Sequence, residues 1–164
     1  MAPRFDNSDN INYLLSNNTS VKLRIIDTAG QERFRSISIT SFKNADSFIL
    51  VYDITNKRSF EVCEEFSKII KENCGHNNIV FLVGNKLDYK RQREVSVEEG
   101  IEFAESHGFH FYETSCKTNE NVQIVLQNLV EETVRRKELS YEYKNFVVLK
   151  KNSRNTDKNK KHCC

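Results

Sequence analysis

The chain has 164 residues, of which 38% are hydrophobic and 29% charged, and its formal net charge is +2. This length predicts one domain, and this composition predicts a domain with a real core. No apolar run approaches the roughly 20 residues that cross a bilayer, and the first residues contain no apolar signal-peptide region, so we expect a cytosolic chain without a membrane span. Cys63, Cys74 and Cys116 are scattered without the spacing of metal ligands, which predicts reduced thiols.

A hairpin is predicted near the beginning of the chain, after a polar and irregular segment at 1–10. Ile11–Leu15 has the pattern of an edge strand and Val21–Ile26 that of the returning strand, and the Ser and Asn residues between them favour a turn. Asp27 follows the second strand directly. Open α/β sheets place ligand groups at such strand ends, so Asp27 is a candidate binding residue.

Residues 33–45 hold four apolar side chains among polar neighbours. These side chains belong to Phe34, Ile37, Ile39 and Phe42. They either pack inward or stay exposed for a partner to contact, and the sequence supports both alternatives equally.

The chain beyond this segment alternates predicted strands and helices. Two continuous apolar runs predict buried strands, at 48–52 and 79–84, and the alternation takes the largely aromatic run at 109–112 as a further strand. We expect the first of these strands to be covered on both faces. Three stretches with helical periodicity predict helices, at 62–70, 97–108 and 122–138. The second helix is expected to begin with a capping box at Ser96–Glu99 and to end at Gly108. The alternation predicts an open, mostly parallel α/β sheet with flanking helices.

The residues that follow the second buried strand carry the functional hypothesis. Asn85, Lys86, Leu87 and Asp88 bring an amide, an amine and a carboxylate together at a strand end. A carboxylate at Asp88 can accept two parallel hydrogen bonds, which guanine offers from N1 and its 2-amino group and adenine does not. Such a site rejects adenine because the carboxylate would be left unpaired. We expect Asn85 at the edge of the base and the stem of Lys86 over its face.

Two further segments complete a resemblance to the small GTPases, in particular to their Rab branch. The run from Asp27 to Phe34 resembles the phosphate-sensing segment of that family, and Ser115–Lys117 resembles its third guanine loop. The resemblance covers roughly residues 10 to 138 and the last two residues, and three motifs in the right order make it specific. We therefore expect these loops to converge on one guanine-nucleotide pocket.

The resemblance implies a role for each residue of the phosphate side. Asp27 would hold a magnesium ion through water, the amide of Gly30 would contact the γ-phosphate, and Gln31 would orient the attacking water. The implied ligands are GTP or GDP with Mg²⁺, and the implied reaction is hydrolysis of GTP to GDP and phosphate.

The resemblance also implies roles on the base side. Ser115 would brace Asp88, the backbone amide of Cys116 would reach the guanine oxygen, and Lys117 would pack nearby. The family usually has Ala in place of Cys116, but a backbone contact tolerates the change. Ile26 stands in place of a common Trp, which leaves the choice of partners open, and the run Ser41-Phe42-Lys43 departs from the family's tyrosine pair before a basic residue.

The C-terminal tail differs from the rest of the chain in charge. Residues 150–162 contain six Lys or Arg against one Asp, a net of +5, and such segments are attracted to anionic leaflets. Cys163 and Cys164 follow, and the resemblance implies that both carry geranylgeranyl groups, since two lipid chains anchor stably where one is marginal. The apolar run Phe146–Leu149 either docks on the domain or contacts a partner.

The glycine-rich phosphate loop of the family has no counterpart in this sequence. None of the five glycines is followed by Lys, and we expect the chain to begin after the family's first strand, phosphate loop and first helix, roughly 40 residues. The gap would open a slot in the sheet or force the strands ending at Asp27 and Tyr52 to pair directly. We expect very weak GTP binding. The alternatives are a GTPase whose gene model lacks its first exon, a nucleotide-independent membrane adaptor, and a non-functional product.

The predicted organisation has three parts. Residues 1–10 form an irregular N-terminus, 11–138 a partial small-GTPase domain and 139–164 a flexible basic tail. The resemblance implies a monomer that cycles between the cytosol and the cytoplasmic face of intracellular membranes. Its implied partners are Rab effectors, exchange and activating proteins, and escort and dissociation-inhibitor proteins. The basic loop Tyr89–Glu94 lacks the aromatic array of a nucleic-acid site, so we expect no nucleic-acid partner.

Overall fold

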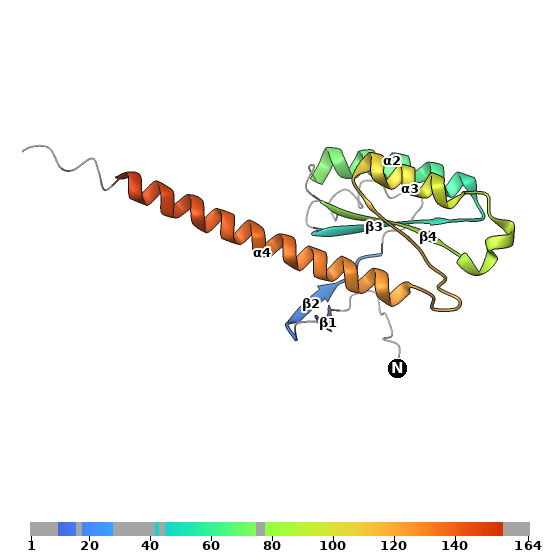
Figure 1. The fold of residues 1–164 in the computed structure, drawn as a ribbon, viewed down its shortest axis with the longest axis horizontal. Helices are drawn as coiled ribbons and strands as arrows, with labels where there is room; N and C mark the ends of the chain where they lie inside the picture. Colours follow the sequence, from blue (N-terminus) through green and yellow to red (C-terminus); the bar gives the residue numbers. More distant parts are fainter. Residues whose placement is uncertain (1–9, 16–17, 28–41, 43–44, 75–77, 156–164) are drawn as a thin grey trace, which may run out of the picture.

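The computed structural model describes residues 10–15, 18–27, 42, 45–74 and 78–155 (Figure 1). Within these residues the elements in chain order are β1 (Asn10–Leu14), β2 (Ser20–Arg24), β3 (Ser47–Asp53), α2 (Lys57–Cys74), β4 (Ile79–Asn85), the 3₁₀-helix η2 (Leu87–Gln92), α3 (Val97–His107), β5 (His110–Glu113) and α4 (Val122–Asn155). The alternation of strands and helices from β3 onward agrees with the prediction.

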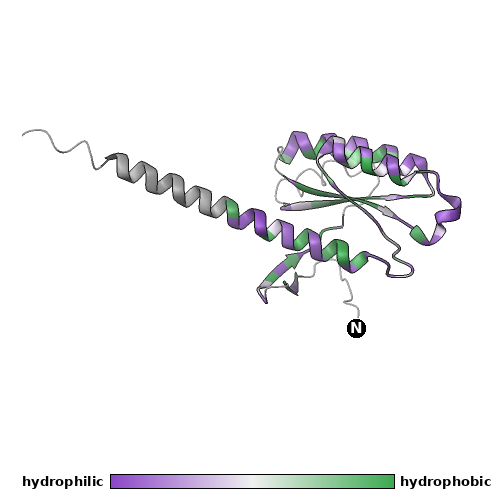
Figure 2. Cartoon of the chain, in the orientation of Figure 1, coloured by the Kyte–Doolittle hydropathy of each residue, from purple (hydrophilic) through white to green (hydrophobic). Residues whose placement is uncertain are grey.

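Strands β3, β4 and β5 form a parallel sheet in that order, with helices on both faces (Figure 1). One face packs against α2 and α3, and its core includes Leu50, Tyr52 and Leu82. The other face packs against the start of α4, where Phe81 of β4 and Leu129 of α4 belong to one hydrophobic cluster. Figure 2 shows hydrophobic residues along the strands and along the first turns of α4. The predicted α/β class with a parallel sheet and flanking helices is confirmed.

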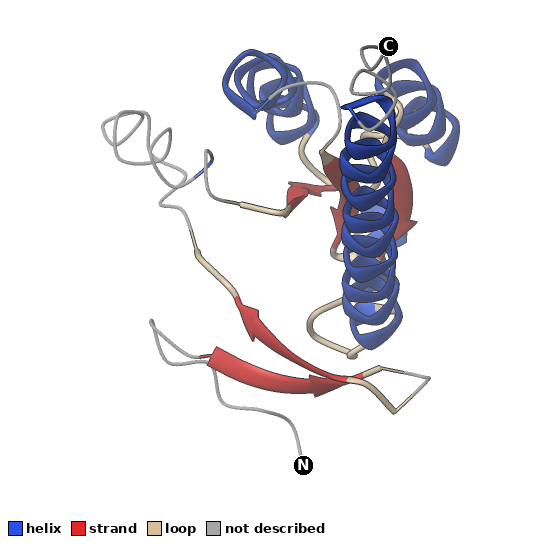
Figure 3. Cartoon of the chain, turned by 90° about the vertical axis from the view of Figure 1, so that its left-hand side faces the viewer, coloured by secondary structure: helices blue, strands red, loops and turns tan. Residues whose placement is uncertain are grey.

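Strands β1 and β2 form the predicted antiparallel hairpin, with Asn10 opposite Arg24 and Leu14 opposite Ser20. Asn18 has a φ of 63°, the left-handed conformation that Asn tolerates in tight turns. The hairpin is a sheet of its own and lies apart from the three-stranded sheet (Figure 3). Of the two predicted outcomes, direct pairing of β2 with β3 is therefore not found among the described residues.

The outer edge of β3 has no strand paired to it in the described part of the chain. Ile49 and Val51 are 41% and 57% exposed, whereas their neighbours Phe48, Leu50 and Tyr52 are buried. The prediction that this strand is covered on both faces was therefore wrong for the described residues: only the face toward α2 and α3 is closed. Of the apolar residues at 33–45, Phe42 packs inward, with its ring 5.5 Å from that of Phe48, and the other three lie outside the described residues.

Helix α3 begins and ends as its sequence predicts. The Ser96 side chain accepts a hydrogen bond from the Glu99 amide, and the Glu99 carboxylate accepts one from the Ser96 amide, which completes the capping box. Gly108 ends the helix with a φ of 70°. Helix α4 behaves differently, because it continues to Asn155 and projects from the rest of the molecule instead of ending near Glu138 (Figure 1).

Candidate functional site

The loops that leave β4 and β5 lie side by side at the carboxyl edge of the sheet, because parallel strands end on the same side. Backbone hydrogen bonds tie them together: the Leu87 amide donates to the Thr114 carbonyl over 2.9 Å, and the Thr114 amide donates to the Gly84 carbonyl over 2.8 Å. The two loops that contain Asn85–Asp88 and Ser115–Lys117 are therefore brought together, as predicted.

Asp88 is held in place by a hydrogen bond from Ser115. The buried Ser115 hydroxyl donates to Asp88 Oδ1 over 2.6 Å, and Lys117 Nζ lies 3.7 Å from Oδ2. Only 13% of the Asp88 side chain is exposed. The hydrogen bond from Ser115 lowers the pKa of Asp88 below its usual value, so the group is ionised at neutral pH. The carboxylate is thus oriented to accept hydrogen bonds from a flat ligand.

Asn85 ties the second loop to the first through its side-chain oxygen. Oδ1 accepts hydrogen bonds from the Cys116 amide over 3.2 Å and from the Thr114 hydroxyl over 3.4 Å. The NH2 group is then the part of this side chain that can donate to a ligand. The sequence predicts that the Cys116 amide donates to a guanine oxygen. In the structure this amide donates to Asn85 Oδ1.

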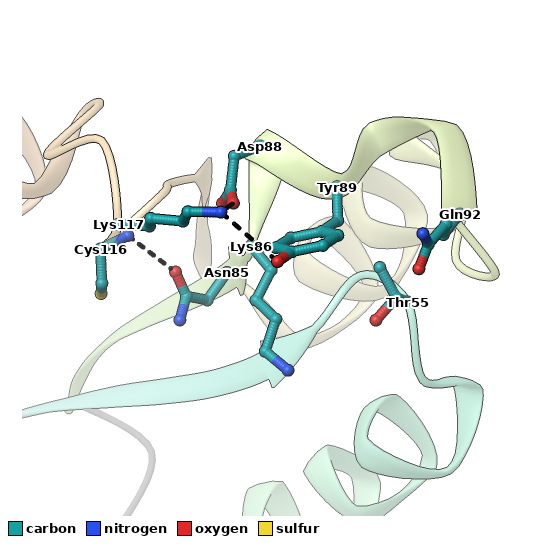
Figure 4. Close-up of a pocket in the computed structure, with 8 residues that line it drawn as sticks. All are labelled: Thr55, Asn85, Lys86, Asp88, Tyr89, Gln92, Cys116 and Lys117. Carbon is teal, nitrogen blue, oxygen red and sulfur yellow. Dashed lines mark hydrogen bonds and ion pairs between the residues drawn. The ribbon is translucent and has the colours of Figure 1, made fainter.

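The two lysines of the site lie along its walls (Figure 4). Lys86 has a φ of 69° and a ψ of 37°, and its ammonium group lies 2.6 Å from Asp53 Oδ2 at the end of β3. Lys117 reaches over the ring of Tyr89, with Nζ 4.9 Å from the ring centroid and 3.4 Å from the hydroxyl. Both ammonium groups are therefore held by neighbouring acceptors or by an aromatic ring.

These side chains surround a cavity of about 420 Å³, within the size range of small-ligand sites (Figure 4). The residues that line it are Thr55, Asn85, Lys86, Asp88, Tyr89, Gln92, Cys116 and Lys117. Five of the eight were predicted from the sequence, and the predicted Ser115 does not line the cavity but bonds to Asp88, which does. Thr55, Tyr89 and Gln92 were missed. Tyr89 and Gln92 belong to the basic loop Tyr89–Glu94. The charges of this loop predict exposure to solvent and give no sign that two of its residues line a cavity.

The phosphate side of the predicted site is described only in part. Asp27 is exposed three residues after the end of β2 and is not in the cavity wall. Gly30, Gln31, Cys163 and Cys164 lie outside the described residues. Among the residues that the structure does describe, no three His, Cys, Asp or Glu side chains form a metal site, and no helix is long and apolar enough to cross a bilayer.

The parallel sheet with helices on both faces is consistent with the α/β fold of a small GTPase domain. The profile described as "Ras family" matches residues 6–135, and the chain therefore belongs to the Ras family, with relatives of the Rab type.

Three Rab proteins illustrate the relationship. The chain is 43% identical to "Ras-related protein Rab-3C" of Bos taurus over 121 residues, which are 74% of this chain and 53% of that protein. It is 47% identical to "Ras-related protein Rab-3" of Caenorhabditis elegans over 111 residues, 68% of this chain and 51% of the relative. It is 43% identical to "Ras-related protein Rab-13" of Canis lupus familiaris over 109 residues, which are 66% of this chain and 54% of that protein. The chain thus spans about half the length of the curated relatives it matches.

Proposed function

We propose that this protein is a Rab-type small GTPase, a guanine-nucleotide switch that recruits effectors in vesicle transport. The braced Asp88 carboxylate at the edge of the cavity carries the proposal, since it matches the paired donors of guanine. The Rab relatives agree with it over the matched part of the chain.

The base would enter the cavity between the two lysines. Its N1–H and 2-amino groups would donate to Asp88, whose carboxylate also accepts from the Ser115 hydroxyl and lies 3.7 Å from Lys117 Nζ. The Asn85 NH2 group would donate to the ring edge, and the Cys116 amide would donate to the guanine oxygen. Adenine presents no such pair of donors, and binding it would exclude water from the Asp88 carboxylate without supplying hydrogen bonds in exchange, at a cost of about 1–3 kcal/mol.

The phosphate side of the site would hold the triphosphate and Mg²⁺. Magnesium is usually bound through one or two carboxylates, with water and phosphate oxygens as the other ligands, so the single carboxylate of Asp27 fits it. When bound, the ion neutralises charge on the phosphate oxygens. Asp27 would hold that ion through water, the amide of Gly30 would donate to the terminal phosphate, and Gln31 would orient water for hydrolysis to GDP and phosphate.

The tail would place the protein on membranes. Geranylgeranylation of Cys163 and Cys164 would supply two lipid chains, and the net charge of +5 on residues 150–162 would add attraction to anionic lipids. The protein would then cycle between the cytosol and the cytoplasmic face of intracellular membranes as a monomer. Effectors, exchange and activating proteins, and escort and dissociation-inhibitor proteins would be its partners.

Exchanging the base that the site prefers tests the proposal. Replacing Asp88 by Asn puts an amide donor where the carboxylate accepted, and the 2-oxo group of xanthine accepts where the 2-amino group of guanine donated. The unaltered chain should bind guanosine in preference to xanthosine, and Asp88→Asn should reverse that preference, as measured by NMR titration of both nucleosides. Adenosine that binds the unaltered chain as tightly as guanosine would refute the proposal.

A further inference from the structure

A carboxylate behind the cavity wall holds one of the lysines that line it. Asp53 ends β3, next to β4, where its register partner is Asn85, the last residue of β4. Asp53 Oδ2 lies 2.6 Å from the ammonium group of Lys86. Asp53 is not one of the residues that line the cavity.

The Asp53 carboxylate is also held by residues other than Lys86. Its other oxygen, Oδ1, accepts hydrogen bonds from the Thr55 amide over 2.9 Å and the Thr55 hydroxyl over 2.7 Å. The backbone amide of Asp53 donates to the Ser59 hydroxyl over 3.0 Å. Partial burial acts to raise the pKa of Asp53, but the hydrogen bonds from Lys86 and Thr55 outweigh it and lower that pKa. Asp53 is therefore a rigid, ionised anchor.

Lys86 is constrained from its backbone as well as from its charge. It is a non-glycine residue in the left-handed conformation, which costs on the order of 1–2 kcal/mol and persists only where the surroundings impose it. With its backbone turned in this way and its ammonium group held at the end of β3, the four-carbon stem between them runs along the cavity (Figure 4). A lysine stem on a surface loop would otherwise sample many rotamers.

The ion pair between Lys86 and Asp53 is partly exposed, so it contributes little to the free energy of folding. The side chains of Lys86 and Asp53 are 52% and 21% exposed, and exposed pairs of this kind have small effects on stability. The geometry of the cavity depends on it much more directly, because the pair fixes one wall.

We propose that Asp53 is a positioning residue for the base: it holds the stem of Lys86 as a preformed apolar wall against which the guanine ring packs. The proposal rests on the guanine-binding function proposed above. It adds to the site a residue, Asp53, that does not line the cavity. Preordering a rotamer-rich side chain removes part of the entropic cost of binding, and we expect that loss of the anchor weakens binding roughly five- to tenfold.

The test uses the 164-residue chain and guanosine, which has no phosphate charge that could respond to the loss of a nearby carboxylate. Asp53→Asn keeps an oxygen for Thr55 and removes only the negative partner of Lys86. Asp46→Asn is the matched control, because Asp46 precedes the same strand and pairs with Lys137 Nζ at the same 2.6 Å, at the end of β3 remote from the cavity. Guanosine affinity, thermal midpoint and the pKa of the Lys86 ammonium group are measured by NMR and calorimetry.

We expect Asp53→Asn to weaken guanosine binding while Asp46→Asn does not, although both change the thermal midpoint by similar small amounts. The pKa of Lys86, which its hydrogen bond to Asp53 raises, should fall in Asp53→Asn. Lys86→Met keeps an unbranched stem but loses the anchored charge, so it should weaken binding to a similar degree. Adding Asp53→Asn to Lys86→Met should then have no further effect.

Three outcomes are decisive. Equal guanosine affinity in Asp53→Asn and Asp46→Asn, with Asp88→Asn still selecting xanthosine, would overturn the positioning role and leave the proposed function standing. Independent, additive effects of Asp53→Asn and Lys86→Met would also overturn it, because they would show that Asp53 does not act through Lys86. An unaltered chain without guanosine binding would overturn the proposed function and this inference together.

Discussion

The hydroxyl group of Tyr52 is buried without a hydrogen-bond partner in the described part of the chain, and its removal should stabilise the protein. Tyr52 is 2% exposed, and its oxygen would lie 2.8 Å from a Cβ atom at Gly84 and 3.0 Å from one at Gly100. The two glycines thus make room for the ring, and the oxygen is crowded from both sides. Burial raises the pKa of Tyr52.

Tyr52→Phe keeps the ring and deletes the unpaired oxygen. Burying a hydroxyl without a partner costs about 1–3 kcal/mol in protein mutational data, whereas the lost dispersion contacts of one oxygen amount to a few tenths. We expect a net stabilisation of about 1 kcal/mol, or a rise of roughly 2–4 °C in the thermal midpoint for a chain of this size. Urea unfolding at pH 7 and differential scanning calorimetry measure both quantities.

A second tyrosine supplies the matched control. The Tyr112 hydroxyl accepts a hydrogen bond from Asn128 over 2.9 Å, so Tyr112→Phe should destabilise the protein by about 1 kcal/mol. Opposite signs for the two substitutions would support the reasoning. A loss of more than 1 kcal/mol in Tyr52→Phe would refute it, because the hydroxyl would then have a favourable partner.

Two further predictions concern the base site and the phosphates. Ser115→Ala removes the hydrogen bond that lowers the pKa of Asp88. Guanosine binding is lost as the pH falls through that pKa, so in this variant it should be lost at a higher pH. An unchanged pH midpoint in NMR titrations would contradict this. The 164-residue chain should bind fluorescent GTP only very weakly, because none of its five glycines begins the Gly-Lys step of a phosphate loop, and micromolar or tighter affinity would show the expectation to be wrong.

Local chemistry decided which structural features could be predicted from the sequence. The capping box at Ser96–Glu99 and the stop at Gly108 depend only on hydrogen bonds and backbone conformation within a few residues, and both are confirmed. The end of α4 was different. The change in composition after Glu138 predicts an end there, but no Gly or Pro follows to stop the helix, and it continues to Asn155.

Features that depend on distant residues could not be predicted. The exposure of Ile49 and Val51 is set by what lies beside β3, and an apolar run carries no information about its neighbours. Thr55 and Gln92 line the cavity only because the loop after β3 and the 3₁₀-helix after β4 meet there. The left-handed backbone of Lys86 was equally hidden, since lysine rarely adopts it without tertiary constraint.

The proposed base site is held together by contacts among its own residues. Asp88 is braced by Ser115, Asn85 holds the Cys116 amide, and backbone hydrogen bonds join the two loops directly to the ends of β4 and β5. A carboxylate fixed in this way cannot turn aside to accommodate a base that lacks the paired donors. Discrimination against adenine should therefore arise from an unsatisfied, preoriented acceptor, and it should be present at the level of the nucleoside before any phosphate is bound.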